Sequence, residues 1–279
     1  MKNKRYFLPV LLLLFATFAS CDKIDEPYIK PGGGGGVVPP GEAVRKVLLE
    51  EYTGHRCPNC PNGAAIAKQI QEIFGEQAIV MAVHAGMFSN PGSSPYTTDY
   101  RTAAGSAWDS YFEVGNQGYP SGIINRQRFD GKIVLGRDSW TEIVAGLVTV
   151  EADASITISP TYNGTTRKLE LDINTEFLNV LEGEFWLQVC LLESGMISAQ
   201  LNQSTIIEDY VHNHVLRQDI NGIWGETLAS NVVVGEKYSK LYEITLDEKY
   251  VAENCAVVAF VYNSETKEIV QAEEVHIIE

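Results

Sequence analysis

Apolar and polar positions divide the chain after residue 42 into two regions with different periodicities. Up to about residue 150, short apolar runs alternate with stretches that carry apolar residues at helical spacing. Residues 45–52 and 78–84 are expected to form strands, and the second is apolar throughout, as in a strand buried on both faces. Helices are expected at 64–74, at about 102–112 and after Ser139, and a hairpin at 123–126 with 132–135.

From about residue 151 onward the helical pattern fades, and β-like segments separated by turn residues replace it. The segments expected as strands are S-I-T-I-S, K-L-E-L-D-I-N, E-F-W-L-Q-V-C-L-L-E, K-L-Y-E-I-T-L, C-A-V-V-A-F-V-Y-N and I-V-Q-A-E-E-V-H-I-I-E. Many short strands with turn signals predict an antiparallel sandwich. We therefore expect one domain at 43–150 and a second at 151–279, with residues 195–230 as a less regular excursion across the sheets.

The first twenty residues have the pattern of a secretory signal peptide. Basic residues precede an apolar run, and small residues lead into a cysteine in F-A-S-C (18–21). This ending resembles a bacterial lipobox, which implies cleavage before Cys21 and its acylation with fatty acids such as palmitate. The alternatives are an ordinary signal peptide that leaves Cys21 free, or a single membrane-anchoring helix. Residues 21–42, rich in Gly and Pro, are expected to be a flexible tether.

The charge balance narrows the classes of partner. The 279 residues include 21 Lys and Arg against 36 Asp and Glu, a formal net charge of −15. Removal of residues 1–20 takes away three positive charges and leaves −18. A surface this acidic repels nucleic acid and anionic lipid headgroups. No nucleic-acid partner is therefore expected, and the expected contact with the membrane is the lipid on Cys21.

Two cysteines in T-G-H-R-C-P-N-C (53–60) are the main candidates for chemistry. Cys57 and Cys60 lie between an expected strand and an expected helix, where the free N–H groups of the helix start stabilise a thiolate. Arg56 adds a positive charge, as His55 does when protonated, and both are expected to contact a substrate. Three interpretations remain open, namely a redox-active pair, a structural disulfide and half of a metal site.

The order of strand, C-x-x-C and helix resembles the thioredoxin-like fold, and G-Y-P-S-G-I-I-N (118–125) adds to the resemblance. The resemblance implies that Pro120 is a cis-proline facing the cysteine pair. It also implies that the backbone of Tyr119 aligns an extended substrate. By the same resemblance Glu51, six residues before the first cysteine, accepts the proton of the resolving cysteine, although Glu50 could point inward instead.

The sequence departs from the thioredoxin pattern at three places. The residue before the first cysteine is Arg56 where thioredoxins carry Trp, and Pro58-Asn59 replaces Gly-Pro. Residues 85–117 are expected to form an insertion that caps the active face or restricts which partners enter.

Three further sites contain residues that can take part in chemistry. Cys190 and Cys255 lie in two expected strands, and a structural disulfide between them is expected, with two buried free thiols as the alternative. H-N-H (212–214) places two imidazoles on one face of a strand, and a role at the surface or in a pocket wall is expected for them. No metal site is therefore expected. His84, at the end of a buried strand, either faces the cysteine pair or caps the sheet.

Taken together, the mature chain resembles the twenty-eight-kilodalton outer-membrane protein family of the Bacteroides group. The resemblance rests on E-Y-T-G-x-x-C-x-x-C-P, on G-Y-P and on H-N-H-V-L-R. It implies an outer-membrane lipoprotein in which an α/β thioredoxin-like domain is followed by an all-β immunoglobulin-like sandwich. Acidic residues directly after Cys21 resemble the export signal of surface lipoproteins in that group.

The expected function is thiol–disulfide exchange with envelope proteins that carry thiols or disulfides, without a cofactor. Cys57 would attack the disulfide of a partner, and Cys60 would resolve the mixed disulfide. The alternative is a non-catalytic surface binding or assembly lipoprotein in which a thioredoxin-like scaffold keeps the pair as a structural disulfide.

Overall fold

The structure, a computed structural model, describes residues 43–278. The predictions of a signal peptide, an acylated Cys21 and a tether fall on residues 1–42 and lie outside the described residues. The described part of the chain contains three α-helices, α1 (Cys60–Phe74), α2 (Ala103–Tyr111) and α3 (Trp140–Leu147). None of its helices is long and apolar enough to cross a membrane.

Strands take up far more of the described chain than helices. They are β1 (Val47–Thr53), β2 (Ala78–His84), β3 (Ser121–Ile124), β4 (Ala154–Asn163), β5 (Lys168–Phe177), β6 (Leu181–Glu193), β7 (Met196–Asn202), β8 (Thr205–His212), β9 (Val215–Asp219), β10 (Glu226–Val232), β11 (Lys237–Thr245), β12 (Cys255–Asn263) and β13 (Ile269–His276). An eight-stranded sheet has the order β13-β12-β6-β9-β2-β1-β3, with β10 paired to β6. A three-stranded sheet has the order β11-β5-β4, and β7 and β8 form a separate hairpin.

The predicted fold class, an α/β thioredoxin-like domain followed by an all-β immunoglobulin-like sandwich, is wrong. The described chain is mostly β, and its largest sheet mixes parallel and antiparallel strands from before and after residue 150. The two groups of strands join where β2 pairs with β9 in parallel, at Ala82 and Val215. The physical reason is that β9 completes an edge of β2 that the prediction left without a partner.

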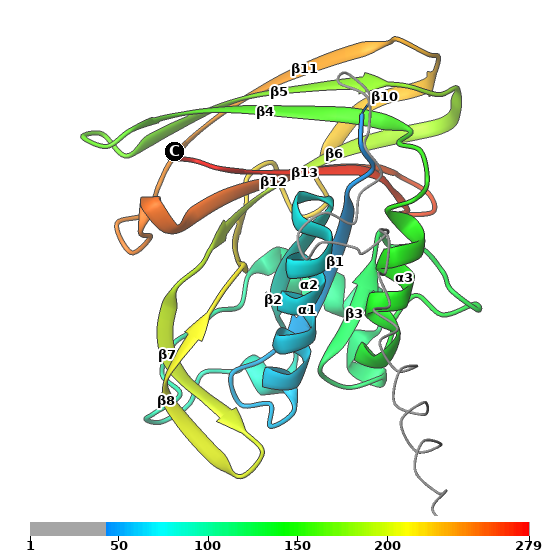
Figure 1. Cartoon of the computed structure of the whole chain (residues 1–279). Helices are drawn as coiled ribbons and strands as arrows, with labels where there is room; N and C mark the ends of the chain where they lie inside the picture. Colours follow the sequence, from blue (N-terminus) through cyan, green and yellow to red (C-terminus); the bar gives the residue numbers. More distant parts are fainter. Residues whose placement is uncertain (1–42, 279) are drawn as a thin grey trace, which may run out of the picture.

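The large sheet is buried on both faces. Along β6 and β12, alternate side chains face either the three-stranded sheet or the interior that contains α2. Figure 1 shows β4, β5 and β11 above β12 and β13, with α1 and α3 lying against β1 to β3. The apolar run 78–84 forms β2 with the predicted bounds, and its side chains alternate between the α1 side and the α2 side. Burial on both faces explains why this run is continuously apolar.

The predicted disulfide between Cys190 and Cys255 is also wrong, because both cysteines are free and buried. Cys190 on β6 pairs in register with Val258 on β12, three residues from Cys255. An odd offset between paired strands puts two side chains on opposite faces of the sheet. Accordingly, Cys190 belongs to the core on the α2 side and Cys255 to the core under the three-stranded sheet.

The same alternation separates the two glutamates of β1. Glu50 faces the α2 side, where it forms a buried bidentate ion pair with Arg126 over 2.7 and 2.9 Å. The Arg126 guanidinium is enclosed by aromatic rings, which are those of Trp108, Phe112, Trp224, Phe260 and Tyr262. Glu51 therefore points the other way, towards α1 and the cysteine pair.

Candidate functional site

Cys57 and Cys60 form a disulfide at the start of α1, with their Cα atoms 5.4 Å apart. The strand β1 ends at Thr53, and a turn closed by the Cys57 N–H and the Gly54 carbonyl leads into the helix. Pro61 lies in the first turn of α1, where its missing N–H costs nothing. In residues 43–278 no group of three or more His, Cys, Asp or Glu side chains is arranged to hold a metal ion.

The peptide bond between Tyr119 and Pro120 is cis, which confirms the predicted cis-proline. The Cys57 Sγ lies 3.6 Å from the Tyr119 carbonyl oxygen, so this backbone directly faces the first cysteine. Helix α1 approaches the proline closely because it carries Gly63 there. A Cβ atom on Gly63 would lie 2.8 Å from the Pro120 Cβ and 3.0 Å from the Glu51 Oε1. The structure thus brings together the cysteines, the proline and Glu51.

Glu51 is a buried carboxyl group next to the second cysteine. Burial raises its pKa from the ordinary value of 4.5 to about 8, so the group carries a proton at neutral pH. Its Oε1 has no hydrogen-bond partner among the described residues. Glu51 and Cys60 both line a cavity of about 30 Å³, which is large enough for a water molecule. A proton can therefore pass between the carboxyl group and a Cys60 sulfur through this cavity.

The disulfide is enclosed, since Cys57 is 1% and Cys60 2% exposed. One wall is the segment after β2, whose Phe88 carbonyl accepts a hydrogen bond from the Arg56 N–H over 3.0 Å. This segment belongs to the predicted insertion 85–117. Arg56 itself is exposed, and its predicted contact with a substrate stays a prediction.

The β7–β8 hairpin forms another wall, and sequence reasoning missed it. The N–H groups of Leu201 and Gln203 donate to the carbonyls of His55 and Pro58, each over 2.8 Å. The buried Gln200 amide donates to the Cys57 carbonyl over 3.1 Å. The only sequence signal for this role is the irregular pattern of residues 195–230, which indicates an excursion but not where it lies.

Three histidines from three parts of the chain meet behind the cysteine loop. The ring centroids of His55 and His84 are 6.3 Å apart, and those of His84 and His212 are 5.6 Å apart. Burial lowers the pKa of all three, that of His212 to about 4, so the imidazoles are neutral at pH 7. His55 is 1% exposed and stacks on Tyr96, so a substrate cannot reach its side chain in this structure, contrary to the predicted contact.

The chain has similarity to outer membrane proteins. The family model described as outer membrane protein Omp28 matches residues 105–279. This match includes Tyr119, Pro120 and the β7–β8 hairpin but begins after the two cysteines. A solved domain of the outer membrane lipoprotein Omp28 from Porphyromonas gingivalis is 29% identical, covering 45% of this chain and 88% of that chain with a TM-score of 0.34. No curated protein gives a match.

Two further solved structures are similar over most of the chain. HBP35 of Porphyromonas gingivalis is 18% identical, covering 85% of this chain and 76% of that chain with a TM-score of 0.64. Protein AGR_C_4864 from Agrobacterium tumefaciens is 15% identical, covering 85% and 96% with a TM-score of 0.49. At this identity, the similarity to HBP35 shows a shared fold and nothing about chemistry.

Proposed function

Because the chain belongs to the Omp28 family of outer membrane proteins, we propose that it performs thiol–disulfide exchange on envelope proteins, at Cys57 and Cys60. The single observation that carries this proposal is the buried Glu51 carboxyl group, whose Oε1 has no partner within residues 43–278 and which shares a small cavity with Cys60. A purely structural disulfide needs no acid beside it, and a buried carboxyl group without a partner costs stability. In thiol–disulfide exchange, by contrast, the Glu51 carboxyl group can donate its proton to the Cys60 thiolate when the disulfide breaks.

The exchange can be followed from the oxidised state. A partner thiolate attacks the Cys57 Sγ, the Cys57–Cys60 bond breaks, and a mixed disulfide with Cys57 forms. Cys60 leaves as a thiolate and takes the proton of Glu51. A second partner thiol then attacks the mixed disulfide, releasing reduced Cys57 and an oxidised partner. The reverse sequence, with Cys57 attacking and Cys60 resolving, reduces a partner disulfide.

The residues around the pair have separate roles in this exchange. The Tyr119 carbonyl, 3.6 Å from the Cys57 Sγ, lies where it can accept a hydrogen bond from the extended backbone of a partner. Arg56, exposed beside the loop, favours the Cys57 thiolate once the disulfide is reduced. Acylated Cys21, outside the described residues, would hold the chain at the outer membrane. No cofactor is needed, because the electrons move between sulfur atoms.

The burial of both cysteines favours a second candidate function. With 1% and 2% exposure, the pair resembles a structural disulfide inside a surface binding or assembly lipoprotein that has no turnover. In that case the walls around the pair are permanent. The two candidates differ in one measurable property, which is whether a protein thiol can reach Cys57.

The deciding experiment traps the mixed disulfide. The full-length Cys60→Ser variant is expressed in its native envelope, and Cys57-linked partners are sought on a non-reducing gel. The matched control, Cys57→Ser, keeps one thiol but lacks the attacking one, so it should trap nothing. The absence of trapped partners, together with no thiol oxidase or reductase activity in the unmutated protein, would reject exchange in favour of the second candidate.

A further inference from the structure

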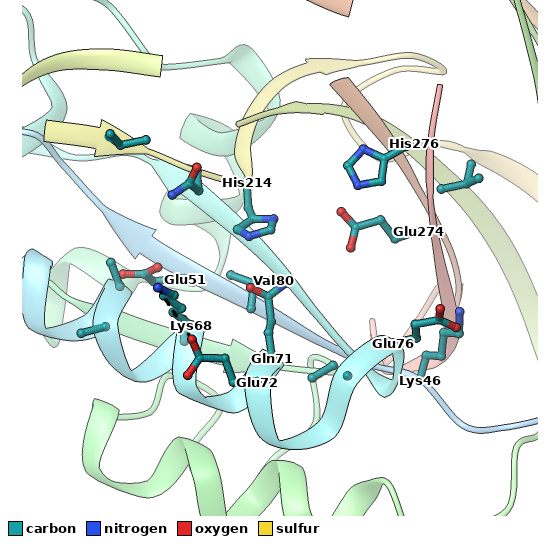
Figure 2. Close-up of a pocket in the computed structure, with 18 of the residues that line it drawn as sticks. Lys46, Glu51, Lys68, Gln71, Glu72, Glu76, Val80, His214, Glu274 and His276 are labelled. Carbon is teal, nitrogen blue, oxygen red and sulfur yellow. Dashed lines mark ion pairs between the residues drawn. The ribbon is translucent and has the colours of Figure 1, made fainter. Parts of the chain in front are cut away.

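A groove of about 1170 Å³ lies beside α1, apart from the face where Tyr119 meets Cys57. Figure 2 shows α1 with Gln71 and Glu72 on one side of the groove, and His214, Glu274 and His276 on the other. It exists because β2 and β9 pair only at Ala82 and Val215, so the sheet splits there. On the α1 side, three alanines, Ala64, Ala65 and Ala67, are among the residues that line it.

Carboxyl groups outnumber ammonium groups in the groove. Five glutamates and two lysines line it, and both lysines already have carboxylate partners. Lys46 pairs with Glu273, and Lys68 pairs with Glu72 over 3.7 Å. Among the described residues the other three glutamates, Glu51, Glu76 and Glu274, have no cationic partner within ion-pair distance.

In two of these unpaired carboxyl groups burial disfavours the ionised form, and a nearby cation would favour it. Burial is the main cause that raises the pKa of Glu274 to about 7, and Lys46 opposes it only partly. Glu51, fully buried at the inner end of the groove, has an Oε1 without a hydrogen-bond partner. An ammonium or guanidinium group near either would stabilise the ionised carboxylate. Within the described chain, no lysine or arginine pairs with these two carboxyl groups, so a cation from a partner could do so.

We propose that this groove binds an extended cationic segment of a protein partner, whose lysine or arginine side chain pairs with Glu274. Its volume exceeds the range of about 300–1,000 Å³ that is usual for small-molecule pockets, which favours a piece of polypeptide. Pro61, Ala64 and Ala65 on α1 form an apolar wall against which the aliphatic part of such a side chain packs. The binding does not depend on exchange at the disulfide.

Polar groups along the groove suit a peptide backbone. Gln71 offers an amide donor and acceptor, Asn213 offers its amide N–H groups, and Tyr210 offers a hydroxyl group. A free polyamine would use the carboxylates but not these groups. Charge complementarity and the polar lining together therefore select a peptide as the occupant.

The test measures binding of a capped Ala-Lys-Ala-Lys-Ala peptide to the full-length oxidised protein by calorimetry. Binding is expected for the lysine peptide and not for the matching glutamate peptide. The Glu274→Gln variant should weaken binding at least tenfold, because it loses one charged contact. The matched control, Glu142→Gln on α3, changes an exposed carboxylate outside the groove and should change binding less than twofold.

Several results would overturn the proposal. If neither peptide binds, the groove has no cationic occupant. If Glu142→Gln weakens binding as much as Glu274→Gln, the peptide is held only by the general negative charge of the chain. If spermidine binds at Glu274 and the lysine peptide does not, the occupant is a small polyamine. Because the protein is used with its disulfide intact, failure here leaves the trapping experiment unaffected.

Discussion

Replacing Glu51 by glutamine should change how the stability of the protein depends on pH. The folded state raises the pKa of Glu51 from 4.5 to about 8, so between these values the folded chain holds a proton that the unfolded chain has released. The free energy of unfolding therefore falls as pH rises through this window. Below pH 4.5 the carboxyl group is protonated in both states and contributes no such loss.

The size of the effect follows from the same two values. Each pH unit inside the window is worth about 1.4 kcal/mol, which gives a loss of about 3–4 kcal/mol between pH 5 and pH 8. A glutamine at position 51 has the same shape and does not titrate, so it removes this contribution. We expect the Glu51→Gln variant to gain about 3–4 kcal/mol relative to the unmutated protein on going from pH 5 to pH 8.

The assay is urea unfolding of the full-length protein at pH 5 and pH 8, with the disulfide intact. The contributions of His55, His84 and His212 occur in both proteins and cancel in the comparison. Glu142→Gln, an exposed change on α3, serves as the control for the loss of one carboxyl group. If Glu51→Gln and the unmutated protein lose the same free energy between the two pH values, Glu51 is not a protonated acid in the folded state, and its role beside Cys60 fails.

Three further changes test other parts of the structure. Burial lowers the pKa of His212 to about 4, so between pH 4 and 6.5 the folded state binds fewer protons than the unfolded chain, and stability falls on acidification. In urea unfolding, His212→Phe should reduce the slope of stability against pH by up to about 1.4 kcal/mol per pH unit. An unchanged slope would contradict this. Arg126→Met leaves the Glu50 carboxylate buried without a partner and should cost about 3–5 kcal/mol. Adding Glu50→Leu should restore most of that in thermal unfolding, and a double variant as unstable as the single one would rule out the ion pair as the cause. Gln200→Ala should speed reduction of the disulfide by dithiothreitol about fivefold, which is the equivalent of one hydrogen bond of about 1 kcal/mol. As the control, Gln203→Ala removes an exposed side chain and should have little effect on the rate. Equal rates in the two variants would refute this.

Local patterns in the sequence predicted most of the strands, but they missed β7 to β10 and did not show which strands pair. The run 78–84 forms β2 with the expected bounds. A strand buried on both faces needs apolar side chains at every position, so the continuous apolar run indicates its burial directly. Alternation along a strand shows which side chains share a face and leaves open which strand lies beside it. The pairing of Ala82 with Val215 joins segments more than a hundred residues apart, and no spacing in the sequence encodes it. The error in fold class and the error over Cys190 both come from this gap.

The candidate site divides in the same way. Cys57, Cys60 and Glu51 are close in the chain, and the strand and turn between them bring them together, so a motif could find them. Pro120 was found because its local sequence resembles a known turn before a strand. Gln200 lies 143 residues from Cys57 in the chain. No local pattern around Gln200 predicts that its amide donates a hydrogen bond to the Cys57 carbonyl. The chemical groups were therefore predictable, and the hairpin that encloses them was not.

Access to Cys57 is where the two candidate functions separate, and the β7–β8 hairpin is one of the two walls that restrict it. β7 and β8 pair only with each other, and isolated two-stranded hairpins are marginally stable in water. The hairpin is held to the cysteine loop by two backbone hydrogen bonds and by the Gln200 amide, which donates to the Gly54 and Cys57 carbonyls. The exposed Gln203 amide adds a bond to the Asn59 side chain. At about 1 kcal/mol each, breaking the two backbone bonds and the two Gln200 bonds costs about 4 kcal/mol, which leaves roughly one molecule in a thousand open. Local opening of this kind is an ordinary equilibrium of folded proteins, so burial of the disulfide in the closed state is compatible with turnover.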